Sequence, residues 1–373
     1  MGRAPLTGRA SPYTPVVVWN IAGIVAGLAL LVVGGELLVR GASRLALRLG
    51  LSPLVVGLTI VSIATSAPEL AVTIDAVRQD AADLAVGNIV GSNISNIMLV
   101  LGAGALVTPL IVRRAIILRD LPIMVGFAVA LLIVAPGGVS WVEGGVLLVA
   151  YVATLVYTVR VGRSEAADSS DLPDPAEAER PVWTSIAFVI GGVAALVGGA
   201  QLLVNGAVGI ATSLGVSELV IGLTIVSIGT SLPELAATIV AVRRGETDMA
   251  VGNVVGSNIA NIGLVLGLPA LVSGGSIGVP TSAISFDIPL MIAASVTLVV
   301  LCYTDRCIRR WEGALMLGLY VAYVAHIVLA TQWREGLQGF TFVLVWFVLP
   351  LVVLLVGLAV VRQVHRDLSR RAR

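Results

Sequence analysis

Long apolar segments, separated by short polar connections, run through almost the whole of this sequence. Most are about 18 to 25 residues long, which allows an α-helix to cross a hydrocarbon core of about 30 Å. The strands of a membrane barrel would instead alternate polar and apolar residues. The pattern therefore predicts an all-α polytopic membrane protein with eleven spans, at residues 17–39, 53–77, 84–107, 121–135, 142–159, 183–205, 218–242, 249–272, 287–303, 312–330 and 340–361.

One block of the sequence occurs twice. Residues 57–102 and 222–267 align without a gap, and 34 of the 46 positions are identical. Weaker matches continue on either side, so each copy belongs to a unit of five predicted spans. Because five is an odd number, the two units cross the membrane in opposite directions, as inverted repeats of secondary transporters do. We predict two inverted five-helix repeats plus one extra C-terminal transmembrane helix.

These boundaries divide the chain into five parts. A leader (residues 1–16) precedes the first transmembrane repeat (17–160), and a polar linker (161–182) joins it to the second, inverted repeat (183–330). The linker is rich in Asp, Glu, Ser, Ala and Pro and has too little apolar surface to fold. Residues 331–373 hold the extra helix and a basic tail. The first span could be confused with a signal peptide, but its Gly34 recurs as Gly199, which makes it part of the repeat.

Composition and charge add a location and an orientation. With 57% hydrophobic residues, 12% charged residues and a mean hydropathy of +1.01, the chain is not an ordinary soluble protein. All 23 basic residues are arginines, and 19 of them fall on alternate connections or in the C-terminal tail. The positive-inside rule then predicts an outside N-terminus and a cytoplasmic linker and C-terminus, in the plasma (inner) membrane. The net charge of +1 gives no indication of a nucleic-acid partner.

Each copy of the block carries one glutamate, Glu69 or Glu234, within an apolar segment and directly after a proline. A charged glutamate at this depth is costly, and no arginine occurs at a comparable depth to pair with it. Two carboxylates brought together repel each other unless one takes up a proton or a cation lies between them. A protonated glutamate that donates a hydrogen bond between helices is the structural alternative. Each glutamate belongs to a polar stripe of helical spacing, formed by Thr59, Ser62, Ser66, Glu69 and Thr73 or by Thr224, Ser227, Ser231, Glu234 and Thr238.

The third and eighth spans supply neutral oxygens. Asn88, Ser92 and Asn96 follow one another at steps of four residues and share one helix face. Hydrogen bonding between helices is the alternative role for such residues, and it is the role we expect for Asn93 and Asn258. The proline before each glutamate also leaves one backbone carbonyl without its helical partner. Carboxylates, hydroxyls, amides and such free carbonyls, without His or Cys at this depth, suit hard cations such as Ca²⁺ and Na⁺. No nucleotide or headgroup motif accompanies them, so we predict inorganic cations as substrates, no cofactor and no enzymatic activity.

The segments 57–69 and 87–96, with their second copies, resemble the paired α-repeats of the sodium/calcium exchanger family. The resemblance implies that Glu69 and Glu234 are the central Ca²⁺ ligands, and that the first and sixth spans slide as a gating pair against the other eight helices. It also implies further ligands for Na⁺ and Ca²⁺. These are Thr65, Ser66, Thr230, Ser231, Ser92, Ser257 and the carbonyls of Ser62 and Ser227, and the final amide pair, Asn96 and Asn261, completes our candidate set.

We therefore predict a secondary active antiporter that exchanges Ca²⁺, or a related divalent cation, for Na⁺ by alternating access at a site between Glu69 and Glu234. In well-characterised exchangers of this family one member of the final Asn pair is an aspartate, whereas Asn96 and Asn261 are both neutral. The missing carboxylate weakens the case for three Na⁺ per cycle and leaves H⁺ as the alternative coupling ion. A cation channel is a remote alternative, since channels surround a pore with symmetric subunits. A monomer in the lipid bilayer suffices for this mechanism, and an oligomer is compatible with it.

Overall fold

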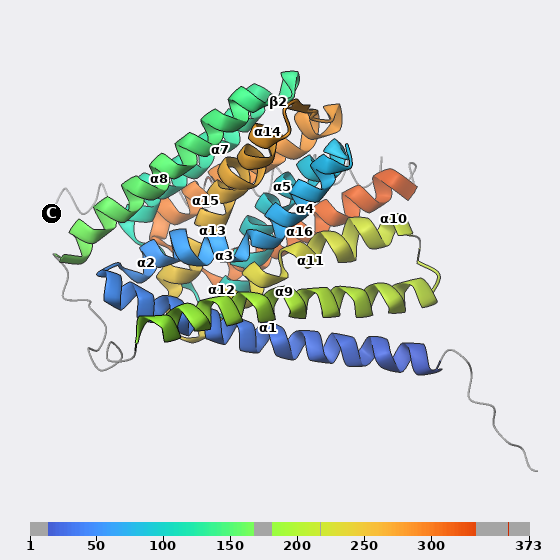
Figure 1. Ribbon diagram of the computed structural model, residues 1–373, viewed down its shortest axis with the longest axis horizontal. Coiled ribbons are helices and arrows are strands. Elements are labelled where there is room, and N and C mark those ends of the chain that lie inside the picture. Colours follow the sequence, from blue (N-terminus) through green and yellow to red (C-terminus); the bar gives the residue numbers. More distant parts are fainter. Residues whose placement is uncertain (1–13, 168–180, 217, 333–356, 358–373) are drawn as a thin grey trace, which may run out of the picture.

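A computed structural model describes residues 14–167, 181–216, 218–332 and 357 of the chain. Eight of its helices are long and apolar enough to cross a membrane, and two bent pairs of shorter helices bring the spans among the described residues to as many as ten. The predicted all-α membrane fold is therefore confirmed (Figure 1). Most of the predicted leader, and all of the predicted eleventh span except Gly357, lie outside the described residues.

The two halves contain the same elements in the same order. The first half consists of α1 (Thr14–Leu49), α2 (Pro53–Val56), η1 (Gly57–Val61), α3 (Ser62–Thr65), α4 (Ala67–Arg78), α5 (Ala82–Ser95), η2 (Asn96–Leu101), α6 (Gly102–Val107), β1 (Leu110–Ile111), η3 (Ile116–Asp120), α7 (Leu121–Val134), η4 (Ala135–Gly137), β2 (Val139–Ser140) and α8 (Trp141–Ala167). The second half consists of α9 (Val182–Ser213), α10 (Glu218–Ile221), η6 (Gly222–Val226), α11 (Ser227–Thr230), α12 (Leu232–Arg243), α13 (Thr247–Ala260), η7 (Asn261–Leu266), α14 (Gly267–Val272), β3 (Ser276–Ile277), η8 (Ala283–Asp287), α15 (Ile288–Asp305), β4 (Cys307–Ile308) and α16 (Arg310–Gln332).

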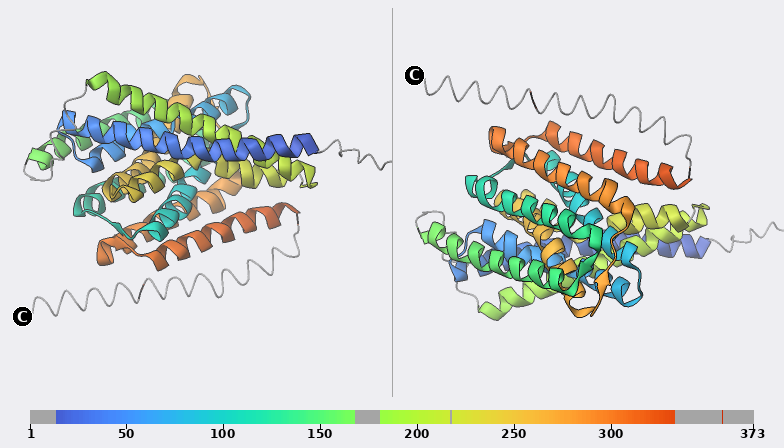
Figure 2. Two further views of the ribbon diagram at one scale, coloured as in Figure 1. Left: turned by 90° about the horizontal axis from the view of Figure 1, so that it is seen from below. Right: turned by 90° about the horizontal axis from the view of Figure 1, so that it is seen from above.

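The helices α1 and α9 lie side by side along one edge of the bundle (Figures 1 and 2). They contain 36 and 32 residues, which corresponds to about 54 and 48 Å at 1.5 Å per residue, well beyond a hydrocarbon core of about 30 Å. Both continue past the predicted ends at residues 39 and 205. Likewise, α8 continues to Ala167, so the first residues of the predicted linker are helical. Strong helix formers such as Ala, Leu and Arg extend a helix that has already formed, even where the apolar pattern ends.

The contact between α1 and α9 is a glycine seam. A Cβ atom on Gly34 would lie 2.7 Å from the backbone nitrogen of Leu196 and 2.8 Å from the carbonyl oxygen of Gly192. Such close approach of two backbones requires residues without side chains. Gly27 meets Gly199 in the same way, so residue numbers rise along one helix as they fall along the other, and the helices are antiparallel. The seam consists of Gly27, Gly34 and Gly41 in α1 and Gly192, Gly199 and Gly206 in α9.

Substitution of a glycine inside the seam should destabilise the protein far more than substitution of a glycine outside it. We expect Gly34→Val to lower the free energy of unfolding by about 1–3 kcal/mol or more, because the added side chain meets backbone atoms that cannot rotate away. Gly191→Val is the matched control, since no atom of the described residues lies within 4 Å of a Cβ at that position. Thermal unfolding of the purified variants measures the difference. Equal melting temperatures would show that α1 and α9 are not tightly packed.

The second span of each half is a broken helix. The segment Pro53–Thr65 meets α4 at an angle of 42°, and Thr224–Thr230 meets α12 at 54°. Ser66 and Ser231 at the breaks leave helical geometry, with ψ angles of 2° and 1°. In both halves a proline occupies the first turn of the following helix, where its missing N–H is not needed. The duplicated Ser-x-Pro-Glu sequence therefore ends one helix and starts the next, which places the glutamate in a first turn.

π-helical turns occur at equivalent positions of the two halves. The pair η1 and η6 opens the duplicated blocks, and the pair η2 and η7 begins at Asn96 and Asn261. A π turn shifts the backbone hydrogen bond from residue i−4 to i−5 and is frequent at functional sites. The hydrophobic periodicity of the sequence did not predict these turns. Two of the candidate ligands therefore lie where the regular hydrogen-bond pattern of a helix changes.

The two halves are joined to each other at both ends of the bundle. The short strand β1 pairs antiparallel with β4, and β2 pairs antiparallel with β3, so each sheet contains one strand from each half. Between the sheets, Gly102 packs against Gly313, and Gly267 packs against Gly144, with backbone atoms in direct contact. These symmetric contacts hold the helices other than α1 and α9 together as one core.

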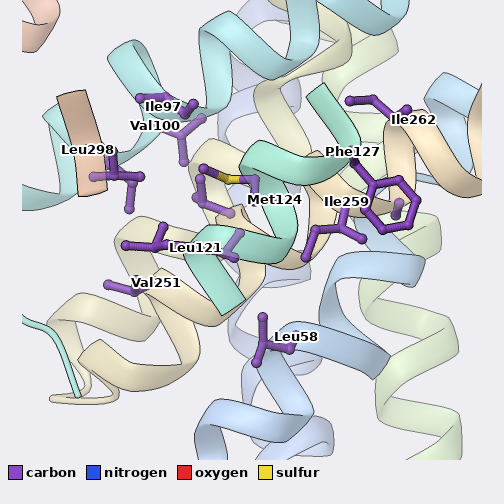
Figure 3. Close-up of a cluster of buried hydrophobic side chains, with 14 of the residues drawn as sticks. Leu58, Ile97, Val100, Leu121, Met124, Phe127, Val251, Ile259, Ile262 and Leu298 are labelled. Carbon is purple, nitrogen blue, oxygen red and sulfur yellow. The ribbon is translucent and has the colours of Figure 1, made fainter. Parts of the chain in front are cut away.

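The interior of this core is apolar on either side of the broken helices. Met124 and Phe127 of α7 are buried, and Phe127 lies beside Ile259 of α13 and near Ile262 of η7 (Figure 3). In a membrane such contacts stabilise by close packing rather than by exclusion of water. The polar residues described next are embedded in this apolar interior.

Candidate cation-binding site

The two duplicated glutamates lie at the centre of the molecule. Glu69 is in the first turn of α4 and Glu234 in the first turn of α12, with exposed fractions of 1% and 0%. Their carboxyl groups are close enough for a direct electrostatic interaction. None of the ion pairs found among the described residues involves either glutamate. The buried Glu312 differs from them, because it accepts a hydrogen bond of 2.7 Å from the backbone N–H of Arg309.

The breaks in the helices bring two hydroxyl groups to the same region. Ser66 and Ser231 are both 1% exposed, and neither hydroxyl has a hydrogen-bond partner among the described residues. Both precede a helix whose N-terminal dipole favours a negative charge in its first turn. The breaks therefore give each glutamate a partly compensating field and place a free hydroxyl three residues before it.

Thr65 connects the two halves at this level. Its side chain lies beside the carboxyl group of Glu234, and its hydroxyl lies 3.2 Å from the amide oxygen of Asn253 and 3.4 Å from the hydroxyl of Ser257. Its counterpart Thr230 is half-buried at the equivalent end of α11. The structure thus brings together Thr65, Ser257 and Glu234, three residues that the family resemblance implies as ligands.

The hydroxyl and the carbonyl of Ser62 both form hydrogen bonds within the broken helix. Its hydroxyl donates to the carbonyl oxygens of Leu58 and Thr59 in its own helix, at 2.8 and 3.1 Å. Its carbonyl oxygen accepts from the backbone N–H of Ser66 at 3.0 Å and from the Thr65 hydroxyl at 3.4 Å. Any cation at this carbonyl would have to replace or share these bonds. The side chain of the counterpart Ser227, in α11, lies outside the described residues.

The asparagines of α5 and α13 take two separate roles. Asn93 accepts a hydrogen bond of 3.0 Å from Asn261 and donates to the sulfur of Met291, and Asn258 donates to the backbone oxygen of Asn93. The expected structural role of Asn93 and Asn258 is therefore confirmed by their contacts. Asn261 is both a structural donor through its amide nitrogen and a free acceptor through its amide oxygen.

Asn88 and Asn253 form hydrogen bonds to the broken helices that the sequence pattern did not predict. Asn88 donates to the carbonyl oxygen of Glu69 at 3.1 Å and to the hydroxyl of Thr73 at 3.0 Å. Asn253 donates to Thr238 at 3.3 Å while its amide oxygen accepts from Thr65. These amides fix the broken helices against α5 and α13. The equal spacing of Asn88 after Thr73 and of Asn253 after Thr238, 15 residues in each half, was the available sequence signal.

Buried polar atoms without partners are concentrated at this site. In lipid or protein interior each such atom costs free energy unless a ligand or water satisfies it. They come from both halves and include all four carboxylate oxygens. Among the described residues the unpaired oxygens of the candidate set are both carboxylate oxygens of Glu69 and of Glu234, the hydroxyls of Ser66, Ser231 and Ser92, and the amide oxygens of Asn96 and Asn261.

The two ends of the bundle differ in their packing around the site. We define the linker end as the end where α8 finishes and α9 begins. At this end Gly252 and Gly256 of α13 are buried against Leu54, Leu58 and Ser62. At the opposite end the equivalent Gly87 and Gly91 of α5 have no described atom within 4 Å of a Cβ position, and Gly87 is exposed. Among the described residues, the helices therefore pack more tightly around the site at the linker end.

This fold and this site define a class of protein. Two inverted repeats of transmembrane helices, with broken helices that place unpaired polar atoms between the halves, are the architecture of secondary transporters. Two carboxylates and neutral oxygens are a ligand set for hard cations. Among the described residues there is no cluster of three or more His, Cys, Asp or Glu, so neutral oxygens must supply much of any coordination shell.

Comparisons with known proteins identify the family. The family model for the sodium/calcium exchanger protein matches residues 19–160 and 184–329. The chain belongs to the sodium/calcium exchanger family, as its paired repeats indicated.

Several relatives are similar over nearly their whole length. The chain is 39% identical to the putative antiporter CaxA of Alkalimonas amylolytica over 311 residues, which cover 80% of this chain and 96% of the relative. It is 34% identical to the sodium/calcium exchanger MaX1 of Methanosarcina acetivorans over 342 residues, covering 82% of this chain and 97% of the relative. A solved structure of the sodium-calcium exchanger NCX_Mj, soaked with Na⁺ and Sr²⁺, superposes with a TM-score of 0.71 at 33% identity, covering 83% of this chain and 98% of that one.

Proposed function

We propose that this protein is a secondary active antiporter that exchanges Ca²⁺, or a closely related divalent cation, for Na⁺. The transported ion binds between Glu69 and Glu234. The observation that supports this most directly is the pair of fully buried carboxyl groups, one from each inverted half, whose four oxygens have no partner among the described residues. The family membership supports cation antiport as the general function.

The geometry suits exchange because both kinds of cation use the same ligands. A divalent ion between the two carboxylates removes their mutual repulsion and satisfies oxygens that are costly to bury alone. Monovalent ions at the same oxygens do the same, so an empty, doubly charged site is the unfavourable state. The site therefore changes its access from one side of the membrane to the other only when one of the two ion species occupies it.

We assign the neutral ligands in two groups. The first group has free oxygens that face no protein partner, and the second already takes part in hydrogen bonds that an arriving ion would exchange. The first group is Ser66, Ser231, Ser92, Asn96 and Asn261. The second group is Thr65, Ser257 and the carbonyl of Ser62, to which Thr230 and the carbonyl of Ser227 are added by the repeat symmetry.

We propose an orientation with the N-terminus outside and the linker end of the bundle in the cytoplasm of the cell, within the plasma (inner) membrane. Arginines such as Arg113, Arg114, Arg243 and Arg306 lie on connections at the linker end, in agreement with the positive-inside rule. In this orientation the structure is closed toward the cytoplasm. One chain carries the complete proposed site, so transport requires no second copy.

The coupling ion is tested with purified protein in liposomes. We expect an outward-directed Na⁺ gradient to drive Ca²⁺ uptake, and a pH gradient alone to drive little. With two Na⁺ exchanged per Ca²⁺, a tenfold Na⁺ gradient supports an accumulation of about 100-fold, since each tenfold ratio corresponds to about 1.4 kcal/mol. An ionophore that dissipates the Na⁺ gradient is the control. Uptake driven only by the pH gradient would assign H⁺ as the coupling ion, and uptake under neither gradient would reject the antiport proposal.

A further inference from the structure

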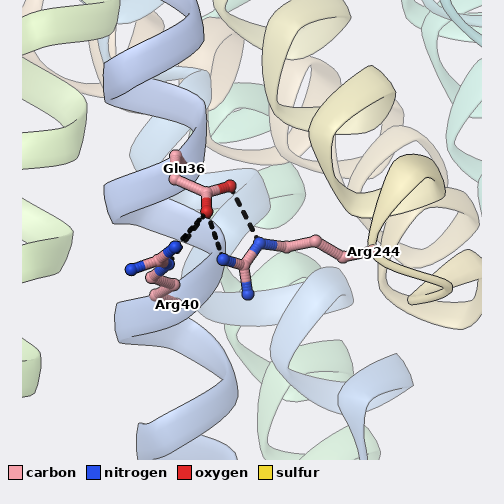
Figure 4. A network of polar contacts seen from close by, with 3 residues as sticks. All are labelled: Glu36, Arg40 and Arg244. Carbon is pink, nitrogen blue, oxygen red and sulfur yellow. Dashed lines mark hydrogen bonds and ion pairs between the residues drawn. The ribbon is translucent and has the colours of Figure 1, made fainter.

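An ion-pair cluster connects α1 to the end of α12 (Figure 4). The guanidinium group of Arg244 donates to both carboxylate oxygens of Glu36, with a distance of 2.8 Å from Nε to Oε2. Arg40, one turn further along α1, donates from Nε to the Glu36 carboxylate at 2.9 Å. Paired contacts from one guanidinium group to one carboxylate are the strongest geometry for such a bond. The cluster therefore ties one of the two long helices to the core.

This cluster lies at the linker end, where the site is tightly closed. Arg244 directly follows α12 and lies three residues before the first residue of α13, and α13 closes that end by packing on α2 and η1. Beside the cluster, Gly35 of α1 packs against Ala236 and Val240 of α12. The same face of α1 thus contacts the core through close packing and through charge.

The repeat does not reproduce the cluster in the other half. The positions equivalent to Glu36, Arg40 and Arg244 are Gln201, Asn205 and Gln79, all uncharged. Gln79 donates to Asp75 of its own helix, and Gln201 is exposed. Ala71 of α4, the counterpart of Ala236, is also exposed. The contact between long helix and core is consequently made at the linker end and not repeated by its counterparts at the opposite end.

We propose that Glu36, Arg244 and Arg40 form an ionic latch that holds the linker end closed and biases the transporter toward the state that is open at the opposite end. In inverted-repeat transporters the two halves exchange conformations when access alternates. In the reversed state Glu36 and Arg244 would take the separated positions that Gln201 and Gln79 occupy here, and the bond would be lost. No charged pair at the equivalent positions replaces it, so the latch stabilises one state only.

The inference rests on the proposed alternating-access function, but its test involves no transported ion. Amide hydrogen exchange of the purified protein reports opening of each end separately. We expect Glu36→Gln and Arg244→Gln each to raise exchange about two- to fivefold in segments 53–62 and 247–256, as befits a partly exposed ion pair, and to lower it in segment 82–91. Arg243→Gln is the matched control, since it removes the same charge from the adjacent, exposed position.

Two further variants make the result decisive. The double variant Glu36→Gln/Arg244→Gln should show no more exchange than either single variant, because the partners act through one interaction. Gln201→Glu with Gln79→Arg builds a pair at the equivalent positions and should shift the exchange pattern in the opposite direction. Additive effects of the single variants, unchanged exchange at the linker end, or an increase spread evenly over all helices would each overturn the latch. Failure of Ca²⁺ flux in liposomes would reject the proposed function without changing these measurements.

Discussion

Glu69→Gln and Glu234→Gln are each expected to lower Ca²⁺ exchange in liposomes by about 100-fold or more. Both carboxylates are fully buried, and removal of one partner from a buried ionic arrangement typically costs 3–5 kcal/mol, where about 1.4 kcal/mol is a tenfold change. Glutamine keeps the size and one oxygen of the side chain but supplies no charge. The loss therefore reports the charge itself and not the shape of the site.

The same variants carry a second, opposite expectation for stability. In a buffer without divalent ions the wild-type site holds two carboxyl groups with no hydrogen-bond partner among the described residues. Either glutamine variant relieves their repulsion and should unfold at the same or a higher temperature than the wild type. Added Ca²⁺ should stabilise the wild type and have little effect on the variants, as ligand linkage requires.

The control for both measurements is Asp75→Asn. This change also removes one carboxylate from α4, but Asp75 is exposed and pairs only locally with Gln79 at 2.7 Å. The rate of Ca²⁺ exchange by Asp75→Asn and its stabilisation by added Ca²⁺ should match those of the wild type. If the glutamine variants transported as well as this control, the cation would not bind between Glu69 and Glu234.

The helix breaks and the buried glutamates could be predicted because short local segments of the sequence determine them. The duplicated Ser-x-Pro-Glu sequence predicted a disturbed helix beside a buried carboxylate, and the structure shows a break at Ser66 and at Ser231. The inversion of the two repeats predicted that the two glutamates meet near the centre of the membrane, and the structure places both of them, fully buried, in the first turns after equivalent helix breaks. Local rules for proline and for charge in a membrane are strong enough to decide such features without tertiary information.

Other features depend on tertiary contacts that the pattern does not contain. Helix ends were placed too early in α1, because apolar periodicity measures contact with lipid and not helix length. The polar stripe did not specify what the Ser62 hydroxyl contacts, and the structure shows that it donates to the preceding turn of its own helix. The hydroxyl of a serine inside a helix can donate a hydrogen bond to its own backbone or to a neighbouring element, and the spacing of polar residues does not distinguish the two.

The difference between the two ends of the bundle could not be predicted from the repeat at all. Residues 87–92 and 252–257 differ at one position only, yet Gly87 is exposed while Gly252 is buried. Under the proposed alternating access, the different surroundings of these nearly identical segments correspond to one of two states, and the repeated sequence is compatible with both. The asymmetry therefore belongs to the conformation, and substitutions at equivalent glycines should separate the two states.

Gly256→Ala and Gly91→Ala are each expected to lower Ca²⁺ exchange, because each prevents closure of a different end of the bundle. A Cβ on Gly256 would lie 2.6 Å from the carbonyl oxygen of Leu58 and 2.8 Å from the Cβ of Ser62, so alanine cannot fit while the linker end is closed. Overpacking of this kind costs about 1–3 kcal/mol, which shifts the balance between the two states by about 5- to 150-fold. Gly256→Ala should thus increase amide exchange in segments 53–62 and 247–256.

Gly91→Ala should leave the described arrangement intact, since no described atom lies within 4 Å of the new methyl group. In the reversed state Gly91 takes the packed role of Gly256, and the methyl group then prevents closure of the end opposite the linker. Ca²⁺ exchange should fall in both variants, while the amide exchange pattern shifts only in Gly256→Ala. Gly126→Ala in α7, also without a described neighbour within 4 Å, is the control. Wild-type transport by Gly91→Ala would mean that the two ends do not exchange roles, and alternating access by repeat exchange would be wrong for this protein.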